Sequence, residues 1–317
     1  MLNGYVKYTD TLTHEVNSQN IAEFGLDIQK FRLTLPTAEF LTNAPATQDC
    51  LVDDYGTMSW LLTNSSSANN VNKLTFTYYN SSGVQIGTED VDRTGANGAY
   101  NTYNAGTSSQ VLHFGVFPGN LQNWSSTFQA LVAANTIQDG YYTVQAKGGF
   151  PGTCSQAYRI NVNCPGNKGF ESIRLCWLNQ WGAWDYFTFT KKSIRTMSNK
   201  PVKYQQSEGT WNARGYRMDS YKGGKKNFRV NTTEKIKINT DYISEDFNTM
   251  FEELTNSIEV YMLKGYSTDM TFKKLDGAVT PVTISSNSFT KKTKANDNLI
   301  QYTFEIELTK KFRTQSV

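Results

Sequence analysis

Two groups of carboxylates in the first half of the chain are dense enough for acid–base or metal chemistry. They are Asp49, Asp53 and Asp54, around the segment CLVDDYG, and Glu89, Asp90 and Asp92, in the segment TEDVDRTG. Paired carboxylates can hydrolyse a glycosidic bond, and several carboxylate oxygens together can hold Ca²⁺. Neither group has EF-hand spacing, and acidic turn residues between strands usually accept backbone hydrogen bonds. We therefore predict no cofactor and no metal ion, with calcium at an acidic loop as the open alternative.

Residues suited to nucleophilic catalysis or zinc binding are few. The two histidines, His14 and His113, accompany no G-x-S-x-G nucleophile elbow. The four cysteines form no C-x-x-C pair, whereas structural zinc needs four nitrogen or sulfur ligands, usually in paired spacings. Cys154 and Cys164 flank a predicted strand, and a disulfide between them or buried thiols are the two alternatives. We therefore predict that the chain is not an enzyme.

An aromatic segment, RLCWLNQWGAWDYFTF, spans residues 174–189 and holds three of the six tryptophans. A core strand pair, a sugar-stacking platform, a membrane-active segment and a subunit interface could each explain it. The sequence predicts a strand, IRLCWL, a turn at N-Q-W-G and a second strand, AWDYFTFT. In the second strand, Trp184 and Tyr186 point to one face and Phe187 to the other.

Rings on both faces of that strand argue against a sugar platform, which pairs an aromatic face with a polar one. The charges of Arg174, Asp185 and Lys191 argue against membrane insertion. Core packing is therefore the first interpretation and a subunit interface the second, because aromatic anchors bury large areas. The predicted packing or interface residues are Trp177, Trp181, Trp184, Tyr186 and Phe187.

The elements that must position these residues are mainly strands. Aromatic residues make up 13% of the chain, and Gly, Asn and Ser punctuate short apolar runs, which favours strands over helices. The stretch IQDGYYTVQAKGG followed by SQAYRINVNC resembles the last two strands of an immunoglobulin-like sandwich. Helical spacing of apolar residues predicts one helix near 121–135, and the polar segment 88–109 is expected to be a long exposed loop.

A boundary between two domains is predicted at NCPGNKG, residues 163–169, where the charge balance changes. Up to Gly166 there are 7 basic and 12 acidic residues, and beyond it 24 basic and 16 acidic, so −5 and +8 give the net +3. We predict an immunoglobulin-like sandwich with an inserted helix over 1–166, and a β-sheet assembly domain over 167–317 with one helix near 245–257. The basic segment between residue 190 and KIKINTDYI, residues 235–243, is read as turn-rich.

Partners can also be judged from charge and hydropathy. Basic residues at 191–203 lie among aromatic ones, a mixture that can meet nucleic acid. The sequence pI of about 8.5 is lower than that of a dedicated binder, which favours solvated strand ends or contacts to acidic protein surfaces. No apolar run reaches the length of a membrane span, and no secretory signal opens the chain. We therefore expect synthesis in a cytoplasm.

One long run, SQAYRINVNCPGNKGFESIRLCWLNQWGAWDYFTF, resembles a pattern in structural proteins of tailed phages, particularly phages of Bacteroidetes and of aquatic hosts. A core of the type (W/F)LN-x-x-G-(A/G)-(W/F)-(D/E)-x-F-x-F opens the second half of those proteins. They also end in a strand similar to QYTFEIELTKKFRTQ. The resemblance covers residues 155–190 well and the last forty or so loosely.

The resemblance implies a virion component of the tail, neck or baseplate, assembled in the host cytoplasm. Such a component forms a ring, with six or twelve copies as candidate symmetries, and meets other virion structural proteins. It brings no catalytic residues. The rival interpretation is a carbohydrate-binding or adhesin module, on a virion tip or secreted, and a glycosidase with paired carboxylates comes third.

Overall fold

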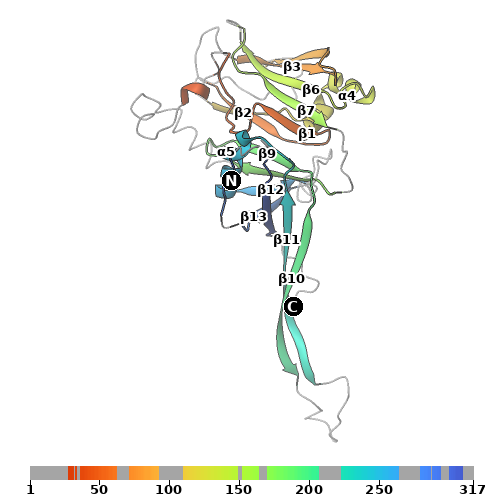
Figure 1. The fold of residues 1–317 in the computed structure, drawn as a ribbon, viewed down its shortest axis with the longest axis vertical. Coiled ribbons are helices and arrows are strands. Elements are labelled where there is room, and N and C mark those ends of the chain that lie inside the picture. Colours follow the sequence, from red (N-terminus) through yellow and green to blue (C-terminus); the bar gives the residue numbers. More distant parts are fainter. Residues whose placement is uncertain are drawn as a thin grey trace, which may run out of the picture.

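The computed structural model is mainly β, as predicted: 51% of the described residues lie in strands and 15% in helices. Figure 1 shows a body built of sheets, from which one long hairpin extends. The structure describes residues 28–31, 33, 36–62, 71–92, 110–148, 152–163, 170–206, 223–263, 279–286, 288–293 and 300–309. None of the helices in this part of the chain is long and apolar enough to cross a membrane.

The first sheet has five strands in the order β1-β7-β6-β3-β4, and only β1 and β7 run parallel. The strands are β1 (Thr47–Leu51), β3 (Val71–Tyr79), β4 (Gln85–Asp92), β6 (Tyr141–Gly148) and β7 (Tyr158–Asn163). Apolar residues alternate with polar ones, so one face is buried and the other meets solvent. On β3, Phe76 and Tyr78 point to the buried face, whereas Thr77 does not.

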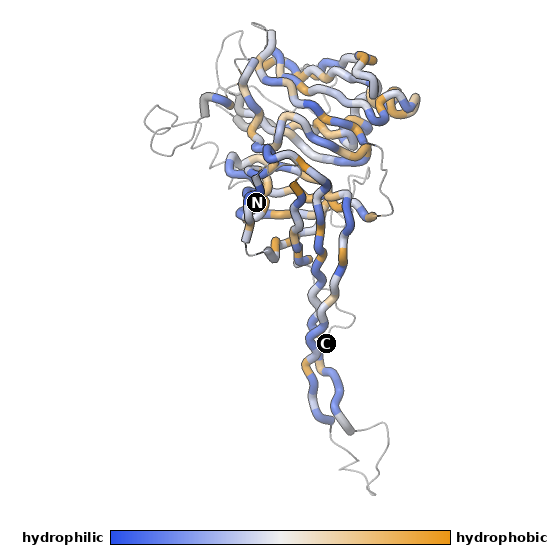
Figure 2. The backbone as a smooth tube through the Cα atoms, viewed as in Figure 1, coloured by the Kyte–Doolittle hydropathy of each residue, from blue (hydrophilic) through white to orange (hydrophobic). Residues whose placement is uncertain are grey.

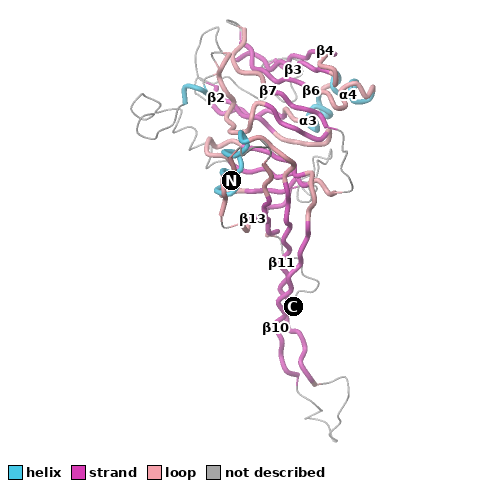
Figure 3. Tube along the Cα trace, viewed as in Figure 1, coloured by secondary structure: helices cyan, strands magenta, loops and turns pink. Residues whose placement is uncertain are grey.

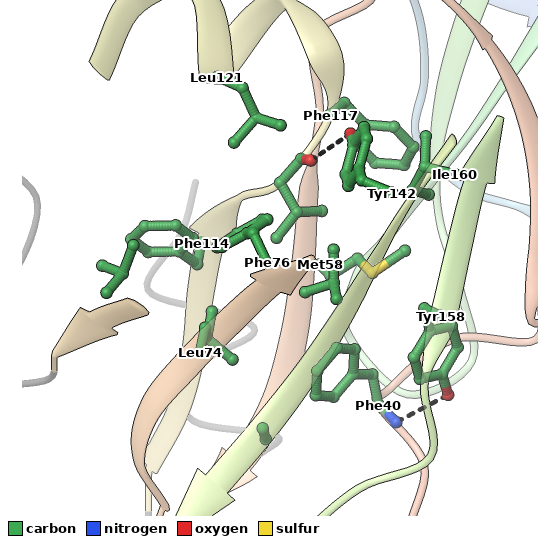
Figure 4. Close-up of a cluster of buried hydrophobic side chains, with 14 of the residues drawn as sticks. Phe40, Met58, Leu74, Phe76, Phe114, Phe117, Leu121, Tyr142, Tyr158 and Ile160 are labelled. Carbon is green, nitrogen blue, oxygen red and sulfur yellow. Dashed lines mark hydrogen bonds between the residues drawn. The ribbon is translucent and has the colours of Figure 1, made fainter. Parts of the chain in front are cut away.

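The buried face of the first sheet packs against a smaller layer. This layer contains a two-stranded sheet of β2 (Thr57–Leu62) and β5 (Gln110–Gly115), followed by α3 (Pro118–Trp124) and α4 (Ser126–Ala133). Their side chains form one hydrophobic cluster with those of the sheet, here called the first core. Figure 4 shows two tyrosines that join it to the backbone: the Tyr142 hydroxyl donates to the Val116 carbonyl at 2.7 Å, and the Tyr158 hydroxyl accepts from the Phe40 N–H at 3.0 Å.

Two predictions for the first half need correction. The helix near 121–135 is two short helices, because Ser125 adopts an extended conformation between them and its hydroxyl accepts from the Phe128 N–H, which caps α4. The loop predicted at 88–109 is wrong for residues 88–92, which belong to β4. Polar residues suit this strand because it lies at a sheet edge. Residues 93–109 lie outside the described part.

The second sheet is antiparallel in every pair and has seven strands in the order β10-β11-β14-β13-β12-β8-β9. They are β8 (Ile173–Leu178), β9 (Trp184–Phe189), β10 (Ile194–Gln206), β11 (Gly224–Asn239), β12 (Val260–Leu263), β13 (Val279–Ile284) and β14 (Thr303–Leu308). The predicted pair of strands at β8 and β9, joined by a turn, is confirmed.

One helical segment covers the second sheet. A 3₁₀ turn, η2 (Glu245–Phe247), leads into α5 (Asn248–Asn256), which confirms the helix predicted near 245–257. Phe251, a residue of α5, is fully buried, and its ring lies 4.9 Å from that of Phe187 and 5.4 Å from that of Phe304. These side chains belong to a second hydrophobic cluster, here called the second core.

The segment read as turn-rich is instead a long hairpin. β10 pairs along its whole length with Gly224–Lys237 of β11, but β14 pairs only with Lys235–Asn239 of β11. Residues Met197–Gln206 and Gly224–Glu234 therefore form a two-stranded ribbon, here called the arm. Eleven residues at about 3.3 Å each give the arm a length of roughly 35 Å. Figure 3 shows it as paired strands that leave the body.

The predicted division at residues 163–169 stays a prediction, because residues 164–169 lie outside the described part. Cys154 carries a buried free thiol, as do Cys50 and Cys176. Cys164 is not among the described residues.

Candidate assembly interface

The aromatic segment lies between the two cores. Every residue of β8 is buried, and β9 presents alternate side chains to opposite sides. Tyr186 packs against the first core, where its hydroxyl lies 3.0 Å from that of Thr57, whereas Phe187 packs against the second. Trp177 is fully buried in the second core. The prediction that both faces of β9 are covered is confirmed.

The other two predicted tryptophans are partly exposed. Trp181, in the turn between β8 and β9, lies against Phe31 with ring centroids 4.6 Å apart. Trp184 lies 5.7 Å from the Tyr261 ring. The segment therefore forms a wall shared by the two cores, and its rings mainly contact residues of the same chain.

Buried polar contacts fasten this wall to the first core. The Arg174 guanidinium lies 3.3 Å from the Asp54 carboxylate and donates to the Tyr55 carbonyl and the Thr188 hydroxyl, each at 2.7 Å. The Arg174 and Asp54 side chains are 6% and 8% exposed, so the pair is shielded from water. Thr188 in turn donates to Asp54 at 2.7 Å. Each charge thus has several partners, which buried charges require.

A second polar cluster lies on the α5 side of the wall. The Asp185 carboxylate accepts from the Thr42 hydroxyl and, at 3.1 Å, from the Asn179 amide. Glu253 on α5 accepts from Asn43 at 2.7 Å. Burial raises the pKa of Asp185 to about 6. Burial, with a smaller effect of the Asp185 charge, raises the pKa of Glu253 to about 7.

Several carboxylates of the groups that suggested metal or glycosidase chemistry have partners within the fold. Asp49 accepts from Asn161 at 2.7 Å, Asp90 pairs with Lys73 at 2.6 Å, and Glu89 accepts from Ser125. Among the described residues, no group of three or more His, Cys, Asp or Glu side chains could hold a metal ion. These carboxylates stabilise strands and a helix start.

The outer face of the first sheet has one aromatic pair. Tyr79 and Tyr141 stack with ring centroids 4.7 Å apart, and the Arg159 guanidinium lies 3.6 Å from the centre of the Tyr141 ring. Because β6 lies between β3 and β7, Tyr141 is enclosed between its two neighbours. Its ring faces are thus occupied, which does not favour sugar stacking here.

The arm has the opposite character, because its side chains lack cover from the described residues. All residues of β10 except Gln206 are exposed, as are the first seven residues of β11. Phe228 is 65% exposed and Met197 is 62% exposed. Three further large apolar residues of the arm are exposed, namely Val202, Tyr204 and Val230. Figure 2 shows hydrophobic positions scattered along an otherwise hydrophilic ribbon.

The charge of the arm is strongly positive. Its basic residues are Lys200, Lys203, Lys225, Lys226 and Arg229, and its one acidic residue is Glu234. β10 is the last strand of its sheet, so its outer edge has no strand beside it in the described part of the chain. A bulge between Val202 and Lys203 leaves Phe228 as an extra residue on β11, and such bulges re-aim side chains.

The predicted site residues and the arm lie on different elements. The sequence identified β8 and β9 from their apolar residues but missed the arm, whose polar strands have no alternating apolar pattern. No pattern of residues marked the arm, because Ser198, Asn199 and Pro201 in β10 are residues typical of turns. A comparison with protein-family models, curated protein sequences and solved structures finds no match to this chain.

Proposed function

We propose that this chain is a structural subunit that acts by assembly, as a component of a tailed-phage virion in the tail, neck or baseplate. The observation that carries the proposal is the arm, with large apolar side chains exposed on a ribbon far from either core. An isolated two-stranded hairpin is at best marginally stable in water. A partner that covers the arm would stabilise it.

The size of the arm suits this role. Ten residues of β10 and eleven of β11 form it, and a standard interface uses roughly 20 to 30 residues on each side. β14 pairs with Lys235–Asn239 of β11 and so joins the base of the arm to the second sheet. The sequence resemblance to virion proteins supports the proposal that the chain belongs to a virion. The alternating strands of the first sheet support an immunoglobulin-like first domain. We propose a ring of such subunits.

Substitution of apolar arm residues tests the assembly role. We expect Met197→Ser/Phe228→Ser to lower the association constant of the chain by at least about tenfold, because exposed aromatic and Met anchors dominate interfaces. Sedimentation velocity over a concentration series measures this constant.

The matched control is Tyr242→Ser/Ile258→Ser, which changes two exposed residues outside the arm. The control should associate as the native chain does. Equal association of all three proteins would contradict an assembly role for the arm.

A further inference from the structure

The arm points away from the body that carries it. Figure 1 shows the first sheet at one end of the long axis and the arm at the other. The arm therefore cannot reach the first sheet of its own chain. None of the described residues covers the exposed apolar side chains of the arm, and the cover that we propose is another molecule.

The first sheet offers an edge of complementary chemistry. β4 is the outermost strand, and its sequence, QIGTEDVD, contains three acidic residues and no basic one. Lys73 on β3 pairs with Asp90, and the charge of Lys147 on β6 also acts on Asp90. Glu89 accepts from Ser125. Three acidic residues against two nearby lysines leave a net charge of −1 at this edge. Val84, just before the strand, is 59% exposed. Among the residues up to 163 whose side chains the structure describes, it is the one exposed large hydrophobic residue.

The opposite edge of the first sheet is less accessible. β1 lies beside β9, within the body of the molecule, whereas β4 lies at the far end (Figure 3). In the described residues no strand pairs with the outer edge of β4 or with that of β10. Two exposed edges can join by main-chain hydrogen bonds, a common mode of recognition between β-proteins.

We infer that the arm of one copy docks on the β4 edge of the first sheet of a second copy. This inference rests on the proposed function. The arm carries five basic residues and one acidic residue, so pairing of two arms would bring like charges together, whereas docking on β4 brings opposite charges together. The contact joins different surfaces of the two copies. It therefore repeats head to tail and gives a closed ring or an open filament.

Added positive charge on β4 tests the acceptor. Gln85 and Thr88 are exposed on this strand, and we expect Gln85→Lys/Thr88→Lys to weaken self-association by about tenfold. The matched control is Ala46→Lys/Thr47→Lys, which adds the same charge at exposed positions on the β1 side of the same sheet. This control should associate within about twofold of the native chain.

A charge swap tests the pairing itself. By itself, Lys200→Glu/Lys203→Glu should weaken self-association. When it is combined in one chain with Gln85→Lys/Thr88→Lys, self-association should be restored. Failure of this rescue overturns the pairing of the arm with β4. Native association of the β4 variant also overturns it.

The arm variant Met197→Ser/Phe228→Ser distinguishes the proposed assembly role of the arm from its docking on β4. If it loses association while the β4 variant keeps it, the arm docks elsewhere and the proposed function stands. If neither variant loses association, both proposals fail.

Discussion

At the scale of residues, buried polar groups between the two cores decide how the molecule responds to substitution and to pH. Arg174 and Asp54 lie 120 positions apart in sequence, and Thr42 and Asp185 lie 143 apart. Each pair joins the wall of β8 and β9 to a loop near β1. Spacing along the chain could not predict such partners, because the two residues of each pair lie on segments that only the fold brings together.

Removal of the Arg174 side chain should lower the unfolding free energy strongly. Arg174→Ala leaves the buried Asp54 carboxylate without its cation, and breaking such a pair costs about 3–5 kcal/mol of unfolding free energy. The control is Arg195→Ala, which breaks exposed ion pairs with Glu171 and Glu234 and should cost no more than about 1 kcal/mol. Urea denaturation measures both, and equal losses would contradict the role of the buried pair.

Stability should fall as pH rises from about 4 to about 7. The pKa of Asp185 is raised to about 6 and that of Glu253 to about 7 in the folded chain, from ordinary values of 3.8 and 4.5. The folded state therefore holds more protons than the unfolded state in this range, and its advantage is lost as the carboxyls ionise. For Asp185, two pKa units correspond to about 3 kcal/mol as an upper value.

The substitution Asp185→Asn tests this assignment. The amide keeps an acceptor for the Thr42 hydroxyl and cannot ionise. We expect a shallower decline of unfolding free energy with pH in the variant, measured by denaturation at several pH values. An unchanged slope would show that Asp185 does not carry the effect.

At the scale of elements, the sequence predicted strands with many apolar residues, such as β8 and β9, but it did not predict β1, which is half buried. β14 has apolar residues at the spacing of two that a half-buried strand imposes, β8 and β9 have apolar residues on both faces, and α5 has the helical spacing. β10 has almost no buried residue, so the pattern that marks a strand was missing. The parallel pairing of β1 with β7 was not predictable either, because it joins strands more than 100 residues apart.

Removal of the arm should leave the body folded. Residues 198–233 can be replaced by Asn-Gly, because Met197 pairs with Glu234 and a two-residue turn can close that hairpin. The described residues removed contribute no buried core side chain, so the unfolding free energy should change by no more than about 1 kcal/mol. A thermal or urea transition measures this change, and a loss of cooperative unfolding would show that the arm is part of the core.

At the scale of the whole molecule, an acidic β4 edge and a basic arm lie at opposite ends of the long axis. The sequence predicted the charge asymmetry between the two halves of the chain. The sequence could not place these charges in space, because the arm begins where β11 extends beyond its pairing with β14. This charge asymmetry suits repeated contacts between copies. Because salt screens the attraction between exposed charges, added salt should weaken these contacts.

The measurement that tests the account most directly is the native mass of the full chain beside that of the chain with residues 198–233 replaced by Asn-Gly. We predict that the full chain forms species larger than a monomer as its concentration rises, and that the shortened chain stays monomeric and folded. A full chain that stays monomeric, or a shortened chain that assembles equally well, would contradict assembly through the arm.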